Sequence, residues 1–325
     1  MATRTRLYRN GTLVLEDFPA RDVSEHLADP ASVVWLDLYR PGTAELVLVG
    51  EEFDIHELAL ESAAQHGQRP KLDRYSTHEF LSAYAVTIGP GGAELSISEI
   101  AVFLTGQAMI TVRKDDGFDI EDVVTRWDES PDLAGHGVGF LLHGLLDHLI
   151  DGHFAAVQQL DDSIEELEDL LFAAGRRQIE TVQHRAFALR KSLVRLRRVV
   201  LPMREVVNSL MRPGLHVITD PLVPYYQDVY DHVLRVIEWT ESLRDMMASV
   251  METNLSVQAN RMNLIMKKVT SWAAIIAVPT AITGYFGQNL PYPGFDRQSG
   301  FIASTSLIVA LSVLLYLIFK RRDWL

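Results

Sequence analysis

The chain has 325 residues, with 43 acidic and 30 basic side chains and a formal net charge of −13. This balance argues against nucleic acid as a partner, because a phosphate backbone binds clusters of Lys and Arg. Cysteine is absent, which excludes disulfides and thiolate metal sites and leaves carboxylates, histidines and backbone oxygens as ligands for hard divalent cations.

Residues 1–138 have the pattern of a compact α/β domain, in which short β-like runs alternate with helical stretches. Turn-forming residues at 89–92 and 105–107 separate neighbouring strands and predict an antiparallel meander at the centre of the sheet. The expected strands are 13–15, 33–38, 80–88, 97–104 and 109–112, and the expected helices are 54–65 and 120–127.

Residues 139–224 have a helical pattern, with apolar residues recurring at intervals of three and four. Gly175 interrupts this pattern and a second helix is expected over 179–211, so the segment predicts a long antiparallel hairpin. Acidic residues gather at 161–169 on the first helix and basic residues at 185–198 on the second. Such runs usually form solvated faces with weak cross-helix ion pairs.

A third helix follows Pro221 and Pro224 and meets no strong breaker before Pro279. It is expected to run from a stalk, residues 225–268, directly into a membrane span, residues 269–287. A lone helix of this length would not be stable in water, so copies of it must bundle. The apolar stalk positions provide a seam for bundling or for packing on the α/β domain; they are Val229, Val233, Val236, Trp239, Leu243, Met246, Val250, Leu255 and Ile265.

A second apolar run, residues 301–319, follows a short loop, residues 288–300, and precedes a basic tail, residues 320–325. Both apolar runs lack formal charge and are long enough, at ~1.5 Å per residue, to cross a hydrocarbon core of ~30 Å. The alternative is a buried hairpin in a soluble domain. It is disfavoured because two charge-free runs joined by a Pro- and Gly-containing loop rarely lie side by side in soluble domains.

Basic residues flank the two spans on one side, at Lys267 and Lys268 and again in the tail. By the positive-inside rule both flanks lie in the cytoplasm. The protein is therefore expected in the lipid bilayer of the cell (inner) membrane, with both termini cytoplasmic and the short loop outside.

One stripe of the first span is small or polar. It consists of Asn263, Met266, Thr270, Ala273, Ala277, Thr280 and Gly284. In a bilayer such a stripe turns away from lipid, either to let helices pack closely or to line a wet pathway. Amides at the two mouths, Asn263 and Asn289, favour the pathway, because neutral oxygens can hold a hydrated magnesium ion without trapping it.

A gate is expected near the start of the span, at Met266 and Val269. A ring of these apolar side chains, one pair from each copy, would exclude water and so block a hydrated ion. Methionine is flexible enough to swing aside when the stalk helices tilt.

Several motifs resemble those of the CorA family of divalent-cation channels, and the resemblance covers nearly the whole chain. They are Arg261-Met262-Asn263, Pro279-Thr280, Gly284-Tyr285, Gly287-Gln288-Asn289 and the upstream segments 68–71, 202–206 and 223–232. The resemblance implies a homopentameric funnel. Its parts are an α+β cytoplasmic domain built as an α/β/α sandwich, a long helical hairpin, and a stalk helix leading into a two-helix transmembrane hairpin. The implied cargo is magnesium, or cobalt or nickel, and no covalent cofactor is implied.

The resemblance also implies a role for Asn289 as the ligand of the hydrated ion. Gln288 stands where the family usually carries methionine. Because the zinc-transporting relatives of the ZntB type also vary this residue, zinc stays open as the alternative to magnesium.

Regulatory cation sites between neighbouring cytoplasmic domains are a further implication of the resemblance. The matching carboxylates are Glu61, Asp147 and Asp228, and for the first two an ordinary surface acid is the alternative. Ser62 stands where the family often carries aspartate. The loss of one carboxylate should weaken a site whose affinity depends on its charge.

The sequence contains no Gly-rich phosphate loop, no His-Glu-x-x-His and no nucleophile elbow, so no enzyme and no catalytic residue is expected. His143, His148 and His153 are spaced by five, which spreads them around a helix and predicts scattered polar residues rather than a metal site. The alternative to a channel is a membrane-anchored, ion-sensing scaffold without flux. It is disfavoured because a tether gains nothing from the polar stripe.

Overall fold

The structure is a computed structural model that describes residues 3–173, 179–212, 217–288, 291, 293–295 and 297–325. The chain divides into two compact units, residues 1–248 and 249–325. Helix α8 (Val223–Phe286) contributes to both and continues through Pro279, as the absence of an earlier breaker predicted.

The first unit is built on a seven-stranded sheet with the order β2-β1-β3-β7-β6-β5-β4. The strands are β1 (Thr3–Arg9), β2 (Thr12–Glu16), β3 (Ser32–Tyr39), β4 (Lys71–Arg74), β5 (Glu79–Ile88), β6 (Leu95–Leu104) and β7 (Ala108–Arg113). All five expected strands are present, and β5, β6 and β7 form the predicted antiparallel meander. Strand β3 pairs parallel to β7 and so joins the meander to the N-terminal strands.

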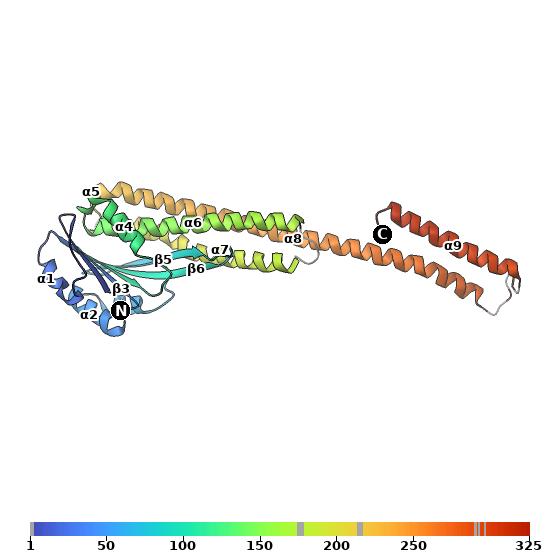
Figure 1. Ribbon diagram of the computed structural model, residues 1–325, viewed down its shortest axis with the longest axis horizontal. Helices are drawn as coiled ribbons and strands as arrows, with labels where there is room; N and C mark the ends of the chain where they lie inside the picture. The colour runs from blue at the N-terminus through green and yellow to red at the C-terminus, as the bar shows by residue number, and fades with distance from the viewer. Residues whose placement is uncertain (1–2, 174–178, 213–216, 289–290, 292, 296) are drawn as a thin grey trace. The chain divides into compact units, whose positions relative to one another are not determined.

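Helices cover both faces of this sheet (Figure 1). A short turn, η1 (Ala20–Asp22), and helices α1 (Val23–Leu27), α2 (Thr43–Phe53) and α3 (Glu57–Ala64) lie on one face, over a core that includes Leu36, Phe80 and Phe103. The other face carries α4 (Glu121–Glu129), α5 (Pro131–Ala134), α6 (Val138–Ala173), α7 (Ile179–Leu210), η3 (Asp220–Leu222) and the start of α8. These three layers confirm the α/β/α sandwich.

Region 139–224, expected as a separate hairpin, shares the core of the sandwich. Leu142, Leu145 and Leu146 of α6 and Met203 of α7 lie in the same apolar cluster as Trp35 of β3. Trp35 also meets Trp127 of α4 edge to face, with ring centroids 4.9 Å apart. The hairpin is therefore one wall of the α/β unit.

Strand β4 and helices α1 and α2 escaped the sequence patterns, and one expected helix begins later than predicted. The helix expected from residue 54 starts at Glu57. Asp54 has a left-handed backbone with φ of 52° and ends α2, which no helix can pass through. His56 then caps α3, its Nδ1 accepting a hydrogen bond from the Leu58 N–H at 3.1 Å.

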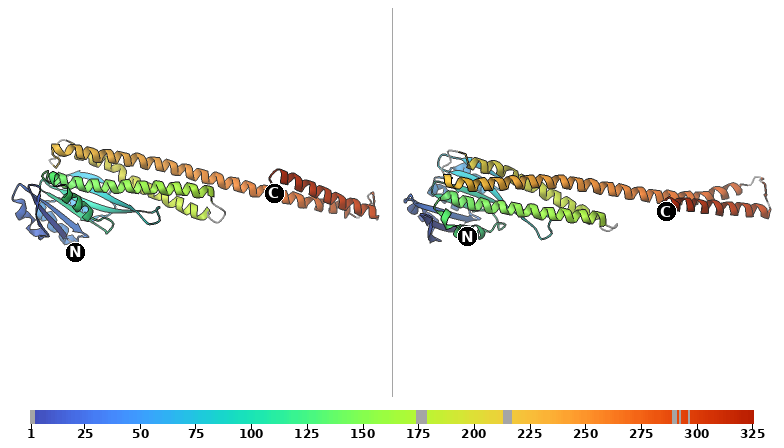
Figure 2. Two further views of the ribbon diagram at one scale, coloured as in Figure 1. Left: turned by 45° about the horizontal axis from the view of Figure 1, so that its top comes forward. Right: turned by 90° about the horizontal axis from the view of Figure 1, so that it is seen from above.

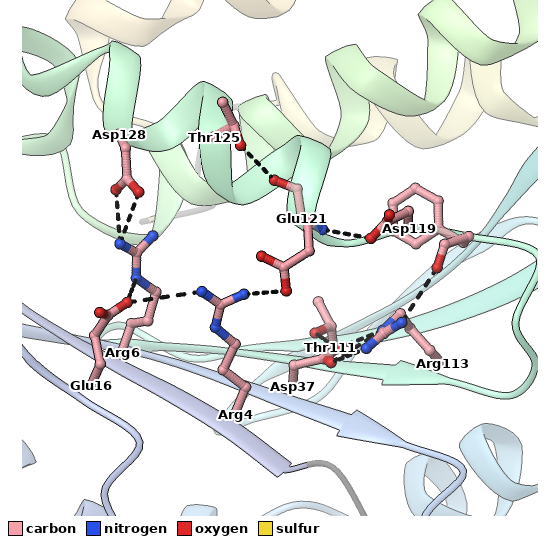
Figure 3. Close-up of polar contacts among 11 residues, drawn as sticks. Arg4, Arg6, Glu16, Asp37, Thr111, Arg113, Asp119, Glu121, Thr125 and Asp128 are labelled. Atoms are coloured by element: carbon pink, nitrogen blue, oxygen red, sulfur yellow. Dashed lines mark hydrogen bonds and ion pairs between the residues drawn. The ribbon is translucent and has the colours of Figure 1, made fainter.

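Strand β1 carries a buried charge, Arg6. Arg6, whose side chain is 3% exposed, pairs with Glu16 of β2 at 2.7 Å and with Asp128 of α4 at 2.8 Å (Figure 3). In the same region Asp37 of β3 pairs with Arg113 and accepts a hydrogen bond from Thr111 at 2.7 Å. These charges can be buried because each has a partner.

The charge runs of the hairpin are divided among several partners. Arg185 of α7 pairs with Glu166 of α6, which is the cross-hairpin ion pair found among the described residues. Arg197 instead pairs with Glu241 of α8, and Asp161 accepts a hydrogen bond from the Trp239 indole N–H at 3.0 Å. The charged residues of the hairpin therefore also contact the stalk helix α8.

The stalk seam packs on the α/β domain along the first part of α8. Val229 and Val233 lie in the sandwich core, and burial continues at Leu243 and Val250. Farther along, the apolar side chain of Leu255 is exposed. Within the first unit the seam thus packs on the domain as far as Leu243, and in the second unit apolar surface is left at Leu255.

The second unit consists of the remainder of α8 and of α9 (Gln298–Arg321), which starts three residues before and ends two after the expected span. Helix α9 runs back antiparallel to the end of α8 (Figure 2). By length and composition, α8 and α9 are the two helices of the described residues that could cross a membrane. The apolar side chains of α9 and of the last part of α8 are largely exposed, as expected of surfaces that lipid or other copies cover.

Candidate ion pathway and regulatory cation sites

The polar stripe of α8 lies on a face that its own chain leaves uncovered. All of its members from Asn263 to Gly284, including Thr270, Ala277 and Thr280, are exposed. By contrast Ser271 is fully buried, and Val278 and Ile282 are partly covered. The exposed surface also includes Trp272 and Ile276, so the stripe is one part of a wider free face.

Two threonine hydroxyl groups near the end of α8 donate to backbone carbonyls of the same helix. Thr280 donates to the Ile276 carbonyl at 3.0 Å, and Thr283 donates to the Pro279 carbonyl at 2.9 Å. Because a hydroxyl oxygen keeps its lone pairs when it donates, Thr280 still presents an acceptor on the exposed stripe. An uncharged acceptor of this kind can hydrogen-bond the water shell of a cation.

The end of α8 requires glycine at position 287. The Gly287 N–H donates to the Thr283 carbonyl at 2.8 Å, and a Cβ on this residue would lie 2.8 Å from the same oxygen. Gly284 is different, since a Cβ there would meet nothing within 4 Å. Gln288 is exposed, and Asn289, the predicted ion ligand, lies outside the described residues.

The two expected gate residues are both exposed on α8, Met266 by 60% and Val269 by 64%. One turn of helix separates them, so both can contribute to a single constriction where copies of α8 approach one another. A constriction needs those copies, and the gate assignment stays a prediction.

Two of the three expected regulatory carboxylates act electrostatically on the same histidine. The pKa of His143 lies below its usual value, because burial of the ring lowers it. The carboxylates of Asp147 on α6 and Asp228 on α8 act in the opposite direction and raise it in part. Asp228 is largely exposed, and the nearest ring nitrogen of His232 is 3.9 Å from it. Asp147 instead pairs with Arg126 of α4.

Glu61 lies on the opposite side of the sheet, on α3, where its carboxylate accepts a hydrogen bond from Gln65 at 2.9 Å. One chain therefore does not bring the three carboxylates together, and no group of three His, Cys, Asp or Glu side chains suited to a metal ion is found among the described residues. A site that uses all three has to form between chains.

Sequence reasoning missed Arg126, which binds both Asp147 and Asp151. Arg126 competes with any cation at Asp147, because its guanidinium already supplies a positive charge and a hydrogen bond to this carboxylate. The sequence places Arg126 on an expected helix and the acidic residues on the following one. This placement does not predict which acidic residue the arginine pairs with.

The three histidines of α6 have separate surroundings. His143 contacts Tyr225 and Tyr226, and His148 contacts Phe118. His153 is fully buried, with Nε2 2.7 Å from the Tyr84 carbonyl. Burial lowers its pKa to about 4, so this imidazole is neutral at physiological pH.

A family model described as "CorA-like Mg2+ transporter protein" matches residues 30–321. The chain belongs to this CorA family. Among its relatives, the putative metal ion transporter YfjQ of Bacillus subtilis is 30% identical over 291 residues, which is 89% of each protein. The cobalt/magnesium transport protein CorA of Thermotoga maritima is 30% identical over 316 residues, covering 95% of this chain and 89% of that protein.

Solved structures agree on the fold of this CorA relative. The complete structure of the CorA magnesium transporter from Methanocaldococcus jannaschii superimposes with a TM-score of 0.79 at 23% identity, covering 100% of this chain and 99% of that one. The ZntB cytoplasmic domain from Vibrio parahaemolyticus covers 80% of this chain and all of that one, with a TM-score of 0.60 at 12% identity. The family is one of membrane transporters rather than of enzymes.

Proposed function

We propose that the protein is a homopentameric channel for hydrated divalent cations, with magnesium as the main cargo. The observation that carries this proposal is the exposed polar stripe of α8. A membrane helix that leaves Asn263, Thr270 and Thr280 uncovered needs either close neighbours or water, and a ring of identical helices provides both. Membership of the CorA family supports the same conclusion.

The pathway selects cations by hydration rather than by fixed charge. Within the described part of the span from 269 to 287 the stripe has no charged residue. Magnesium dehydrates reluctantly, so amide and hydroxyl oxygens that hydrogen-bond its water shell let the ion enter and leave. Cobalt and nickel share an octahedral hydrated form and are expected to follow the same route.

Closure is controlled by divalent cations bound between subunits on the cytoplasmic side. Asp147 and Asp228 both act electrostatically on the His143 ring, and Glu61, on the opposite layer, would meet them from a neighbouring copy. Bound cations would hold neighbouring domains together and keep the ring at Met266 and Val269 narrow. Loss of the cations would release the stalks and open it.

Zinc is the second candidate cargo, because Gln288 stands where the family usually has methionine and the zinc-transporting relatives of the ZntB type also vary this residue. A side-chain amide at the mouth, where the family usually has methionine, changes the ligand from a soft thioether to a hard oxygen or nitrogen group. This exchange alters ion preference without removing the stripe. With both termini cytoplasmic and the short loop outside, the mouth at Gln288 faces the outside of the cell.

The test is ion flux into liposomes that contain the purified protein, measured separately with magnesium, cobalt, nickel and zinc. We expect saturable magnesium uptake, and we expect Asn289→Ala to abolish it while the protein still assembles as a pentamer. Absence of flux for all four ions would leave the anchored scaffold as the better description. Zinc uptake that clearly exceeds magnesium uptake would reverse the order of the two candidate cargoes.

A further inference from the structure

An amphipathic cavity of about 500 Å³ lies in the first unit, between α7, the loop that joins α3 to β4, and the adjacent strands β5 and β6. In Figure 1 this is the side of the sheet along which α7 runs. The volume falls within the range of ~300–1,000 Å³ that is usual for sites that bind a small organic ligand.

The lining of the cavity is positively charged, although the chain as a whole is acidic. Four arginines contribute to it: Arg69 from the loop and Arg195, Arg197 and Arg198 from α7. No Asp or Glu is among the described residues that line it, although the chain has 43 acidic and 30 basic side chains. The rest of the wall is mainly apolar and includes Tyr84, Ile97 and Pro202.

Most of this positive charge is not neutralised by the protein. Arg197 pairs with Glu241, and Arg195 donates to the Leu95 carbonyl at 2.7 Å. Among the described residues, no carboxylate lies within ion-pairing distance of Arg69 or Arg198. Guanidinium groups held together without counter-charges repel one another, and this repulsion is relieved when an anion binds.

The loop that carries Arg69 is held in place by buried polar contacts. Glu99 and Lys114, whose side chains are 6% and 5% exposed, pair at 2.8 Å beneath it. The Gly67 N–H donates to Glu99 at 2.8 Å, Lys114 donates to the Gln65 carbonyl, and the Tyr84 hydroxyl donates to the Gln68 carbonyl. The cavity wall is therefore fixed before any ligand arrives, and fixed walls favour affinity.

We infer that this cavity binds a nucleoside polyphosphate. The arginines match the phosphates, because a guanidinium binds phosphate oxygens through two parallel hydrogen bonds. The apolar wall with the Tyr84 ring matches the base and sugar, which a bare inorganic anion lacks. This site is separate from the polar stripe and from the three carboxylates, so it does not depend on the proposed transport function.

Binding is tested on the full-length protein in detergent by calorimetric titration at one fixed free magnesium concentration. The probes are ADP, pyrophosphate and adenosine, so that phosphate and base contributions are separated. We expect ADP to bind, and we expect pyrophosphate and adenosine each to bind at least about tenfold more weakly, which corresponds to ~1.4 kcal/mol. Equal affinity for ADP and pyrophosphate would overturn the nucleotide assignment, and so would the absence of ADP binding.

Variants identify the site. Arg69→Gln combined with Arg198→Gln removes two exposed arginines without carboxylate partners, so the fold is preserved, and ADP affinity should fall at least about tenfold. The matched control is Arg190→Gln, an exposed arginine of the same helix that does not line the cavity. Unchanged ADP affinity in the double variant, or an equal loss in the control, would place the binding elsewhere. Because no flux is measured, failure here leaves the transport proposal untouched.

Discussion

At the scale of single residues, Met266 and Val269 illustrate how exposure depends on what surrounds a chain. Both apolar side chains are more than half exposed in one copy. Leaving this apolar surface in contact with water costs free energy. Enclosed in a ring of copies, the same side chains become a dry constriction. Their function therefore depends on a property that only the assembly supplies.

Met266→Ser should raise basal magnesium flux in liposomes and reduce its inhibition by internal divalent ions. A hydroxyl group hydrates the ring, and a hydrated ring no longer blocks a hydrated ion. The matched control is Leu264→Ser, an exposed residue two positions earlier and on the other side of α8. A closed-state leak equal to that of the parent would remove Met266 from the gate.

Asp228→Ala should leave the channel active at internal magnesium concentrations that close the parent. Affinity for a hard cation depends on the number of carboxylates, so removing one of the three should weaken the site severalfold or more. Flux measured against internal magnesium tests this. Asp245→Ala, which removes an exposed carboxylate farther along α8, should leave inhibition as it is, and inhibition that persists in Asp228→Ala would exclude this residue from regulation.

At the scale of elements, helix α6 is anchored to strand β5 through a neutral histidine. Burial lowers the pKa of His153 from 6.5 to about 4. Below pH 6.5 the unfolded chain binds a proton at this residue and the folded chain does not until about pH 4, so stability is lost as the pH falls between these values. The loss reaches about 2 kcal/mol at pH 5.

His153→Gln should remove most of this dependence, because glutamine keeps an N–H donor for the Tyr84 carbonyl but does not titrate. The measurement is the free energy of unfolding of the first unit within the full-length protein, by urea titration at pH 7 and pH 5. His184→Gln, which changes an exposed histidine of α7, is the control. An unaltered pH dependence in His153→Gln would assign the acid sensitivity to other groups.

At the scale of the whole molecule, the second unit cannot be complete as one chain. Its two candidate membrane helices leave apolar side chains such as Trp272, Ile276 and Phe301 exposed together with a polar stripe. Lipid can cover the apolar part, whereas the polar part needs other copies or water. Because the surface of α8 is apolar on one side and polar on another, we propose that copies of the helix assemble with their polar stripes facing one another in a pentamer.

Ala277→Trp should reduce flux more than about tenfold, or should prevent pentamer formation, because a large ring on the small-residue stripe fills the space where copies approach. Native mass spectrometry counts the copies and liposome flux measures transport. Ile276→Trp places the same ring one residue away, off the stripe, and should preserve both. Normal flux and assembly in Ala277→Trp would mean that the stripe faces lipid.

The sequence by itself determined the elements whose patterns are local. The five expected strands, the α6/α7 hairpin, the long α8 and the two membrane helices follow from apolar periodicity, charge-free length and turn residues, which depend on neighbours a few positions away. The stripe of α8 was visible for the same reason, since steps of three and four suffice to find one helix face. The family motifs then indicated transport.

Tertiary structure alone decided which charges are paired and which are free. The partners that allow Arg6 of β1 to be buried lie more than 100 residues away or on the next strand, and the pairing of Arg126 with Asp147 could not be read from either helix. The arginine-lined cavity likewise combines a loop at residues 67–70 with α7, which lies more than a hundred residues later. Such sites depend on contacts between distant segments, and periodicity along the chain carries no information about them.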